Sequence, residues 1–301
     1  MPSLFLINPG AGKRKDLVAL QDQIRTIYDQ GKREAIIKLI DFQRLDEDLA
    51  WAEAQGIRRI FAVGGDGTVN AIGSRLIGSS QHFGVIPKGS GNGYARNIGF
   101  SIKTKLAIRQ SLNAKTILVD TGKFAGHPFL NVAGVGLDAE VSRIFAQNGR
   151  RGFRPYAQST FNAILHLTPS TYQVEIDGVH HRFGESFGIA IANGAQWGYD
   201  AKVSKNASIT DGRFDIMVVR KFSVLEAGIL VSRMFNGTLA KDRNVSIYRG
   251  SHIIIEREEA GAIQIDGEPM EAGKLIEVSL HPQSLHLLLP NTLTYERINR
   301  L

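Results

Sequence analysis

The 301-residue sequence contains no cysteine. This absence excludes a disulfide framework, a thiolate metal site, a cysteine nucleophile and a lipid anchor attached through cysteine, and it is typical of proteins of the reducing cytosol. No apolar run approaches the roughly 18 residues that a membrane-spanning helix needs. The first residues lead directly into a strand-like run, which is unlike a secretory signal peptide. We therefore expect a folded, soluble and cytoplasmic protein.

Acidic residues are missing from two long stretches, although the whole chain carries 36 Lys and Arg against 29 Asp and Glu. Residues 67–119 contain no acid, and neither do residues 141–174. Such basic regions attract nucleotide phosphates, anionic lipid headgroups or nucleic acid, although a solvated basic surface is an equally good reading before any motif is considered. The basic residues of the two stretches are Arg75, Lys88, Arg96, Lys103, Lys105, Arg109 and Lys115, then Arg143, Arg150, Arg151 and Arg154.

The pattern of expected strands and helices changes near residue 116. Up to residue 115, short apolar strands alternate with segments of helical spacing, which predicts an α/β domain with an open, mainly parallel sheet. From 116 to 289 short strands and Asp-Gly turns dominate, which favours a mostly-β antiparallel sandwich. We expect residues 290–301 to pack back on the first domain, and a ligand cleft between the two domains. The segments with the most specific predictions are strands at 129–135, 275–280 and 285–289 and helices at 137–147 and 156–167.

The segment Gly64-Gly65-Asp66-Gly67-Thr68 is the most informative motif. It follows a predicted buried strand and opens a helix, which is where ligands bind in open α/β sheets. Glycines let a phosphate approach backbone N–H groups, and we expect Thr68 to cap the helix that follows. Because the Asp66 carboxylate would repel a bare phosphate, it suggests a metal ion or a nucleotide hydroxyl as its partner.

Two more glycine-rich turns follow strands of the same predicted sheet, at Asn8–Lys13 and Pro87–Gly93. Neither fits the P-loop pattern, and the chain has no dinucleotide-binding G-x-G-x-x-G. Three such loops at one sheet edge make a phosphate site a better explanation than three unrelated turns.

Other motifs carry less weight. Asp-Gly at 177, 211 and 266 is also the strongest hairpin signal, so a plain turn at Asp266-Gly267-Glu268 competes with a catalytic one. The G-x-S-x-G pattern around Ser186 leads into a strand rather than a helix, which argues against a serine hydrolase. The histidines show no zinc-binding spacing.

Taken together, six segments resemble the diacylglycerol kinase catalytic-domain family, which also includes sphingosine kinases and bacterial lipid kinases. The resemblance runs nearly from end to end of the chain. The segments, in the family's order, are Asn8–Gly12, Gly64–Thr68, Pro87–Asn92, Phe129–Gly136, Thr210–Asp215 and Ile265–Pro269.

The resemblance implies ATP-dependent phosphorylation of a hydroxyl group on diacylglycerol, a sphingoid base or a related lipid, with ATP and Mg²⁺ as cofactors. It implies a base at Glu268 or Asp266, of which we favour Glu268 with Asp266 as its partner, and a metal-dependent role for Asp66. It places a structural Mg²⁺ at Asp211, with backbone carbonyls near Ser208 and Arg213. The implied nucleotide-binding residues are Asn8, Pro9, Gly10, Ala11, Gly12, Gly64, Gly65, Asp66, Gly67, Thr68, Asn70, Ser90 and Asn92.

A lipid substrate requires contact with a membrane surface. We expect reversible docking on anionic lipid through the basic stretch around Arg143, Arg150, Arg151 and Arg154. Nucleic acid is not an expected partner, and a homodimer is left open.

Two positions depart from bacterial relatives, which usually carry an acid where this chain has Gly93 and Ala71. Because of these two departures, the sequence does not identify the lipid substrate or the residues that bind Mg²⁺. The alternatives to a lipid kinase are an NAD kinase-like phosphotransferase, which lacks support because no Thr-Pro-Thr-Gly-Ser-like segment follows, and a nucleotide- or lipid-binding protein without turnover.

Overall fold

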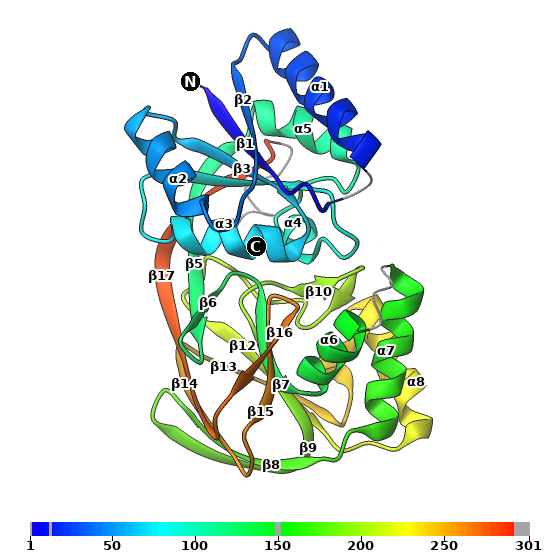
Figure 1. Ribbon diagram of the computed structural model, residues 1–301. Helices are drawn as coiled ribbons and strands as arrows, with labels where there is room; N and C mark the ends of the chain where they lie inside the picture. The colour runs from blue at the N-terminus through cyan, green and yellow to red at the C-terminus, as the bar shows by residue number, and fades with distance from the viewer. Residues whose placement is uncertain (1, 12–13, 148–151, 292–301) are drawn as a thin grey trace. The chain divides into compact units, whose positions relative to one another are not determined.

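The computed structural model describes residues 2–11, 14–147 and 152–291 (Figure 1). The chain divides into two compact units. The first holds the chain up to Val119 and again from Gln283, and the second runs from Asp120 to Pro282. The packing predicted for residues 290–301 lies almost wholly outside the described residues.

The first unit is built on a parallel sheet, which confirms the predicted α/β class. Its strand order is β17-β4-β3-β1-β2, and every pairing along it is parallel. Each of the strands β1 to β4 leads into a helix, as right-handed crossovers require. The elements are β1 (Ser3–Ile7), α1 (Arg14–Gln30), β2 (Ala35–Leu39), α2 (Leu45–Ala54), β3 (Arg59–Gly64), α3 (Asp66–Gly73), η1 (Ser74–Leu76), β4 (His82–Pro87), α4 (Gly93–Asn97) and α5 (Thr104–Leu112).

Aromatic packing fixes the centre of this sheet. Phe5 of β1 stacks on Phe61 of β3 with ring centroids 5.0 Å apart, and it meets Tyr28 of α1 edge-on at 4.9 Å. All three side chains are fully buried. Strands covered on both faces read as continuous apolar runs, which is why β1 and β3 were visible as buried strands in the sequence. Because these strands are packed on both faces, they hold the first residues of the loops that follow them in place.

The second unit is mostly β, as predicted. Its strands follow the order β16-β15-β7-β9-β8-β14-β17 with antiparallel pairing, and β12 and β13 extend the sheet from β9. The strands are β5 (Lys115–Phe124), β6 (His127–Phe129), β7 (Val132–Gly136), β8 (Ser170–Ile176), β9 (Val179–Ala192), β10 (Gln196–Gly198), β11 (Ala201–Lys202), β12 (Phe214–Arg220), β13 (Val245–Gly250), β14 (His252–Arg257), β15 (Gly261–Ile265), β16 (Glu268–Ala272) and β17 (Leu275–Leu289). The helices are α6 (Leu137–Gln147), α7 (Phe153–His166), α8 (Val224–Asn236) and the short η2 (Leu239–Lys241).

Two apolar clusters stabilise the second unit. One lies among the strands and includes Phe124, Phe129 and Phe214. The other joins the sheet to the helices, with Phe187 of β9, Ile164 of α7, and Leu230 and Met234 of α8 as members. Figure 1 shows α6, α7 and α8 gathered on one side of this unit. No helix in the described ranges is long and apolar enough to cross a membrane.

Three details of the second unit differ from the sequence predictions. Helix α8 was not predicted, although Ser223 and Glu226 form a capping box at its start and Gly237 ends it at φ 69°. The single strand predicted at 129–135 is two strands, β6 and β7, separated at Leu130 and Asn131. The two strands predicted at 275–280 and 285–289 are one continuous strand, β17.

Candidate functional site

The three glycine-rich loops of the first unit leave the same edge of its sheet. In the parallel register Ile7 of β1 lies opposite Val63 of β3, and Gly64 of β3 lies opposite Pro87 of β4. The loops that follow these strands therefore begin side by side. This is the edge at which open α/β sheets bind ligands.

Asn8 ties the first loop to the second. Its Nδ2 donates to Thr68 Oγ1 at 2.8 Å, and its Oδ1 accepts from the backbone N–H of Gly10, also at 2.8 Å. The expectation that Thr68 caps the next helix is wrong, because α3 begins at Asp66 with Gly65 as its N-cap. Thr68 lies in the first turn of α3 and holds the Asn8 side chain instead.

The second and third loops touch through glycine. A Cβ atom on Gly89 would lie 2.5 Å from Gly65 Cα and 2.9 Å from Asn92 Oδ1, so no larger residue fits without a backbone shift. Asn92 closes the third loop: its Oδ1 accepts from Gly89 N and its Nδ2 donates to Gly89 O, both at 2.9 Å. It does so in the left-handed conformation, at φ 49°, which asparagine tolerates better than most residues.

Asp66 lies at the start of α3, between the second and third loops. Its Oδ1 accepts the backbone N–H of Tyr94 in α4 at 3.2 Å. The residue as a whole is half-buried.

The remaining nucleotide-binding candidates fall on the same three loops. Pro9 and Gly10 are exposed, and Asn70 and Ser90 are half-buried. Gly12 lies outside the described residues. The structure thus groups the described candidates at one edge, while the binding itself stays a prediction.

Asp266 of the second unit is engaged by backbone donors. Its Oδ2 accepts from Leu130 N at 2.9 Å, and its Oδ1 accepts from Asn131 N at 2.8 Å and Val132 N at 3.0 Å. In a continuous strand at 129–135 these N–H groups would instead donate to carbonyl groups of neighbouring strands or point away from them. The carboxylate therefore explains why β6 and β7 are separate.

Glu268 differs from Asp266 in exposure. Asp266 and Gly267 both have positive φ, 49° and 91°, and form the tight turn between β15 and β16. Glu268 is the first residue after this turn and is exposed, whereas Asp266 is 9% exposed. The sequence motif is thus a hairpin whose two acids have different environments.

Asp211 has a cation partner within the protein. Arg249 donates its Nη2 to Asp211 Oδ2 and its Nε to Asp215 Oδ1, the latter at 3.0 Å. Arg213 N donates to Asp211 Oδ1 at 3.2 Å, and the Ser208 hydroxyl interacts with Thr210. These contacts fit a Mg²⁺ site poorly, because the guanidinium of Arg249 already compensates the carboxylate on which the ion would depend. Within the described residues no group of three or more His, Asp or Glu side chains is placed to hold a metal ion.

Sequence reasoning missed two buried acids that organise the loop before β12. Asp120 Oδ2 accepts the N–H of Gly212 at 2.8 Å, and Asp215 accepts the hydroxyl of Ser204 at 2.5 Å. Asp215 stood within a quoted motif but had no assigned role, and nothing around Asp120 in the sequence marked it.

Ser186, the central residue of the G-x-S-x-G pattern, is buried in strand β9 and donates its hydroxyl to Gly184 O at 3.1 Å. This placement agrees with the prediction that it is no hydrolase nucleophile.

The basic stretch proposed for membrane docking is described in part. Arg143 pairs with Glu140 on α6, and Arg154 is exposed on α7. Arg150 and Arg151 lie outside the described residues.

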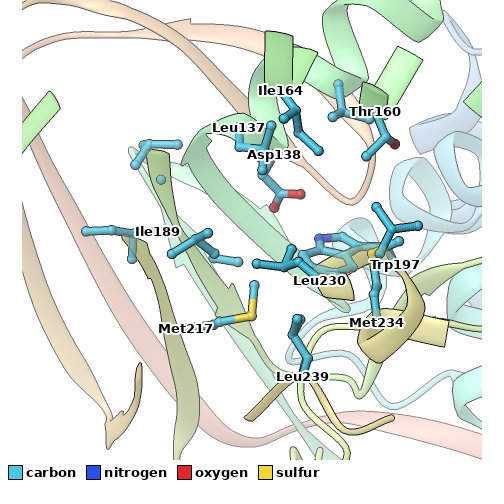
Figure 2. A pocket seen from close by; sticks show the side chains of 16 residues that line it. Leu137, Asp138, Thr160, Ile164, Ile189, Trp197, Met217, Leu230, Met234 and Leu239 are labelled. Carbon is cyan, nitrogen blue, oxygen red and sulfur yellow. The ribbon is translucent and has the colours of Figure 1, made fainter. Parts of the chain in front are cut away.

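The second unit also contains an apolar pocket that the sequence did not reveal (Figure 2). It lies between the sheet and the three helices and has a volume of about 50 Å³. Its walls come from α6, α7, α8 and strands β7, β9 and β12, and the carboxylate of Asp138 projects into it (Figure 2). Most lining side chains are aliphatic or methionine, so its preferred occupant is apolar.

Two protein families match the chain. Residues 2–124 match the diacylglycerol kinase catalytic domain, and residues 131–289 match the YegS C-terminal NAD kinase beta sandwich-like domain. The second match alone covers more than half of the sequence.

Named relatives are similar over most of their length. The chain is 29% identical to the protein named "Probable lipid kinase YegS-like" of Chromohalobacter salexigens over 72% of each chain. It is 25% identical to "Probable lipid kinase YegS" of Escherichia coli over 96% of each chain, and 24% identical to "Diacylglycerol kinase" of Bacillus subtilis over 77% of each. A crystal structure named for a diacylglycerol kinase of Bacillus anthracis has the same fold, with a TM-score of 0.74 over 97% of this chain and 98% of that one at 17% identity.

Proposed function

Because the chain belongs to the family that joins a diacylglycerol kinase catalytic domain to a YegS-type C-terminal domain, we propose that it transfers the γ-phosphoryl group of ATP to a hydroxyl group of a membrane lipid. The observation that carries the proposal is the convergence of the three glycine-rich loops at one edge of the parallel sheet. The names of the relatives, which are kinases of lipids, agree with it.

In this proposal the three loops bind the triphosphate of ATP. Backbone N–H groups at the start of α3 and in the turns around Gly10 and Gly89 are suited to phosphate oxygens, and the close approach of Gly65 to Gly89 keeps side chains out of the way. Asp66, which is half-buried at the start of α3, would hold the Mg²⁺ that accompanies ATP. This ion would neutralise phosphate charge during transfer.

Glu268 is the base in this reaction. The lipid hydroxyl gives its proton to the Glu268 carboxylate as its oxygen bonds to the γ-phosphorus, and the bond from that phosphorus to the bridging oxygen breaks to release ADP. Glu268 is exposed, whereas Asp266 has its oxygens directed at three backbone N–H groups. Asp266 therefore positions the turn, and Glu268 performs the proton transfer.

The apolar pocket of the second unit holds an aliphatic chain of the lipid. Met217 and Met234 line it, and their unbranched side chains can repack to widen a narrow cavity.

The membrane partner is an anionic bilayer that α8 contacts. The exposed face of α8 is uncharged and presents Val224, Leu225 and Ile229, which are 55%, 90% and 55% exposed. The opposite face lines the lipid pocket through Leu230 and Met234. A helix that is apolar on both faces beside a lipid pocket suits the surface of a bilayer.

The experiment is a transfer assay with γ-labelled ATP. Anionic vesicles carrying diacylglycerol, monoacylglycerol, ceramide or a sphingoid base are offered separately, with NAD⁺ as a soluble acceptor. We expect label in a lipid that extracts into chloroform. Label on NAD⁺ alone supports the NAD kinase-like alternative, and nucleotide binding without label in any acceptor supports a non-catalytic protein.

A further inference from the structure

The apolar pocket of the second unit has one polar end. Asp138 of α6 and Trp197 of β10 meet there, and Figure 2 shows the Asp138 carboxylate directed toward the indole. The other lining side chains are aliphatic, such as Val135 and Leu137, apart from the thioethers of two methionines and the hydroxyl of Thr160. A carboxylate in such surroundings is costly, so its presence calls for a reason.

The chain accommodates the carboxylate by specific means. Asp138 Oδ2 accepts from Gln264 Nε2 at 2.8 Å, and Gln264 is only 1% exposed. A Cβ on Gly134 would lie 2.7 Å from the same oxygen, so glycine at this position makes room for it. Burial raises the pKa of the Asp138 carboxyl to about 6, against the lowering effect of the N–H donors of Trp197 and Gln264.

Trp197 supplies a donor at the same end. Its buried Nε1 lies close enough to the Asp138 carboxylate to lower the pKa of that carboxyl, but among the described residues it makes no hydrogen bond of accepted geometry. The pair therefore presents an acceptor, the Asp138 carboxylate, next to an N–H donor that is not held in a well-formed hydrogen bond. A hydroxyl group complements both, because it donates one hydrogen bond and accepts another.

Gln264 links this end of the pocket to the turn before Glu268. While its Nε2 binds Asp138, its Oε1 accepts the backbone N–H of Gly267 at 2.8 Å. A shift of the Asp138 carboxylate would therefore be transmitted, through one side chain, to the residue that precedes Glu268.

We infer that Asp138 and Trp197 form a binding site for a lipid hydroxyl group other than the one phosphorylated, and that Gln264 couples its occupancy to the position of the Asp266–Glu268 turn. The inference rests on the proposed function in taking the pocket's occupant to be the lipid substrate. It names the substrate class more closely: an aliphatic lipid with a second free hydroxyl. Asp138 and Gln264 are positioning residues in this account.

Charged groups outside the pocket do not explain the state of Asp138. Burial and the two N–H donors account for its pKa shift, and no neighbouring charge contributes. The titratable and charged groups on α6 and on the elements packed against it lie outside the pocket lining: Glu140 and Arg143 on α6, Arg154 and His166 on α7, His180, His181, Arg182 and Glu185 on β9, and Glu268 and Glu271 on β16.

The binding test uses Trp197 as its own reporter. The chain has two tryptophans, so Trp51→Phe leaves Trp197 as the single tryptophan of the full-length protein, and excitation at the red edge of the tryptophan absorption band selects it over the tyrosines. We expect its emission to respond to 1-oleoylglycerol in neutral detergent micelles at a concentration at least about tenfold below that needed for methyl oleate, which has the same chain and no hydroxyl. Asp138→Leu should remove this difference, and Glu140→Leu on the same helix should keep it.

Two further measurements distinguish the positioning role of Asp138 and Gln264 from a purely structural one: the pH dependence of Trp197 emission, and the separate effects of a variant on turnover and on lipid binding. In the Trp51→Phe protein we expect the emission of Trp197 to titrate near pH 6, and Asp138→Asn to abolish that transition. Gln264→Met should lower turnover about tenfold with little change in binding, because it breaks the link and leaves the donor–acceptor pair.

The two proposals fail in different ways. A preference for 1-oleoylglycerol that persists in Asp138→Leu overturns the inference even if the wild type phosphorylates lipid. A preference lost in that variant supports the inference even if no lipid is phosphorylated. A Trp197 emission that responds to neither lipid overturns it outright.

Discussion

At the scale of single residues, the ionisation of Asp138 gives a stability prediction. Burial raises the pKa of its carboxyl from 3.8 to about 6 in the folded protein. The folded state therefore holds the proton more tightly than the unfolded chain, and the resulting stabilisation is present at low pH and lost as pH rises through about 6. The free energy of unfolding of Asp138→Asn, measured relative to that of the wild type, should rise by about 2 kcal/mol when the pH is raised from about 4.5 to about 7.5. Urea unfolding at the two pH values measures this difference, and a pH-independent difference contradicts it.

Arg249 gives a second prediction at this scale. It bridges Asp211 and the buried Asp215, and its removal would leave the Asp215 carboxylate without its cation. Arg249→Met should therefore lower the free energy of unfolding by about 2 kcal/mol, a value reduced from that of a buried pair because the arginine is half-exposed. EDTA should leave the midpoint of thermal unfolding of the wild type unchanged. An unfolding midpoint that falls with EDTA and recovers with Mg²⁺ would support the magnesium site predicted at Asp211.

At the scale of elements, the loop after β4 depends on glycine. Gly89→Ala would place a Cβ against Gly65 Cα and separate the second and third loops. We expect ATP affinity to fall at least about tenfold, since the loops would no longer present their N–H groups together. Gly273→Ala, where a Cβ meets nothing within 4 Å, is the matched control. Calorimetric titration with ATP checks both, and equal affinities would refute the loop assignment.

The exposed face of α8 is the element for membrane binding. Each exposed large apolar side chain that enters a bilayer contributes about 1.5–3 kcal/mol. Leu225→Ser with Ile229→Ser should therefore weaken binding to anionic vesicles at least about tenfold, whereas Val179→Ser with Leu275→Ser, two apolar side chains exposed on other elements, should not. High salt should weaken any electrostatic contribution from basic residues such as Arg143 and Arg154 and leave the apolar contribution of α8. Vesicle sedimentation measures both, and equal loss in the two double variants would contradict this surface.

The sequence predicted elements well where one pattern was uninterrupted. Helix α6 has the bounds predicted from its apolar spacing, 137–147, because nothing competes with that spacing. The break between β6 and β7 escaped prediction because it depends on a carboxylate 135 positions away from Asn131 in the chain. Helix α8 escaped because its outward face carries apolar residues, which blurs the helical periodicity. The pocket around Asp138 had no local signal at all, since its lining comes from many separate segments.

At the scale of the whole molecule, the chain belongs to a family of lipid kinase-like proteins, with the glycine-rich loops in an α/β unit and the apolar pocket in a mostly-β unit. The glycine-rich loops were visible in the sequence because each motif is local. The sequence also favoured Glu268 over Asp266 as the base, but the contacts that distinguish the two acids were not visible in it, because they depend on which acid the backbone of residues 130–132 engages.

The most direct test measures transfer of labelled γ-phosphate to vesicle lipid by the wild type, Glu268→Gln and Glu271→Gln, the last an acid on the same strand. We expect labelled lipid from the wild type and from Glu271→Gln, and a loss of about 10²-fold or more in Glu268→Gln with ATP binding unchanged. A wild type that labels no lipid, or a Glu268→Gln variant that labels it at the wild-type rate, would contradict the proposed lipid kinase activity.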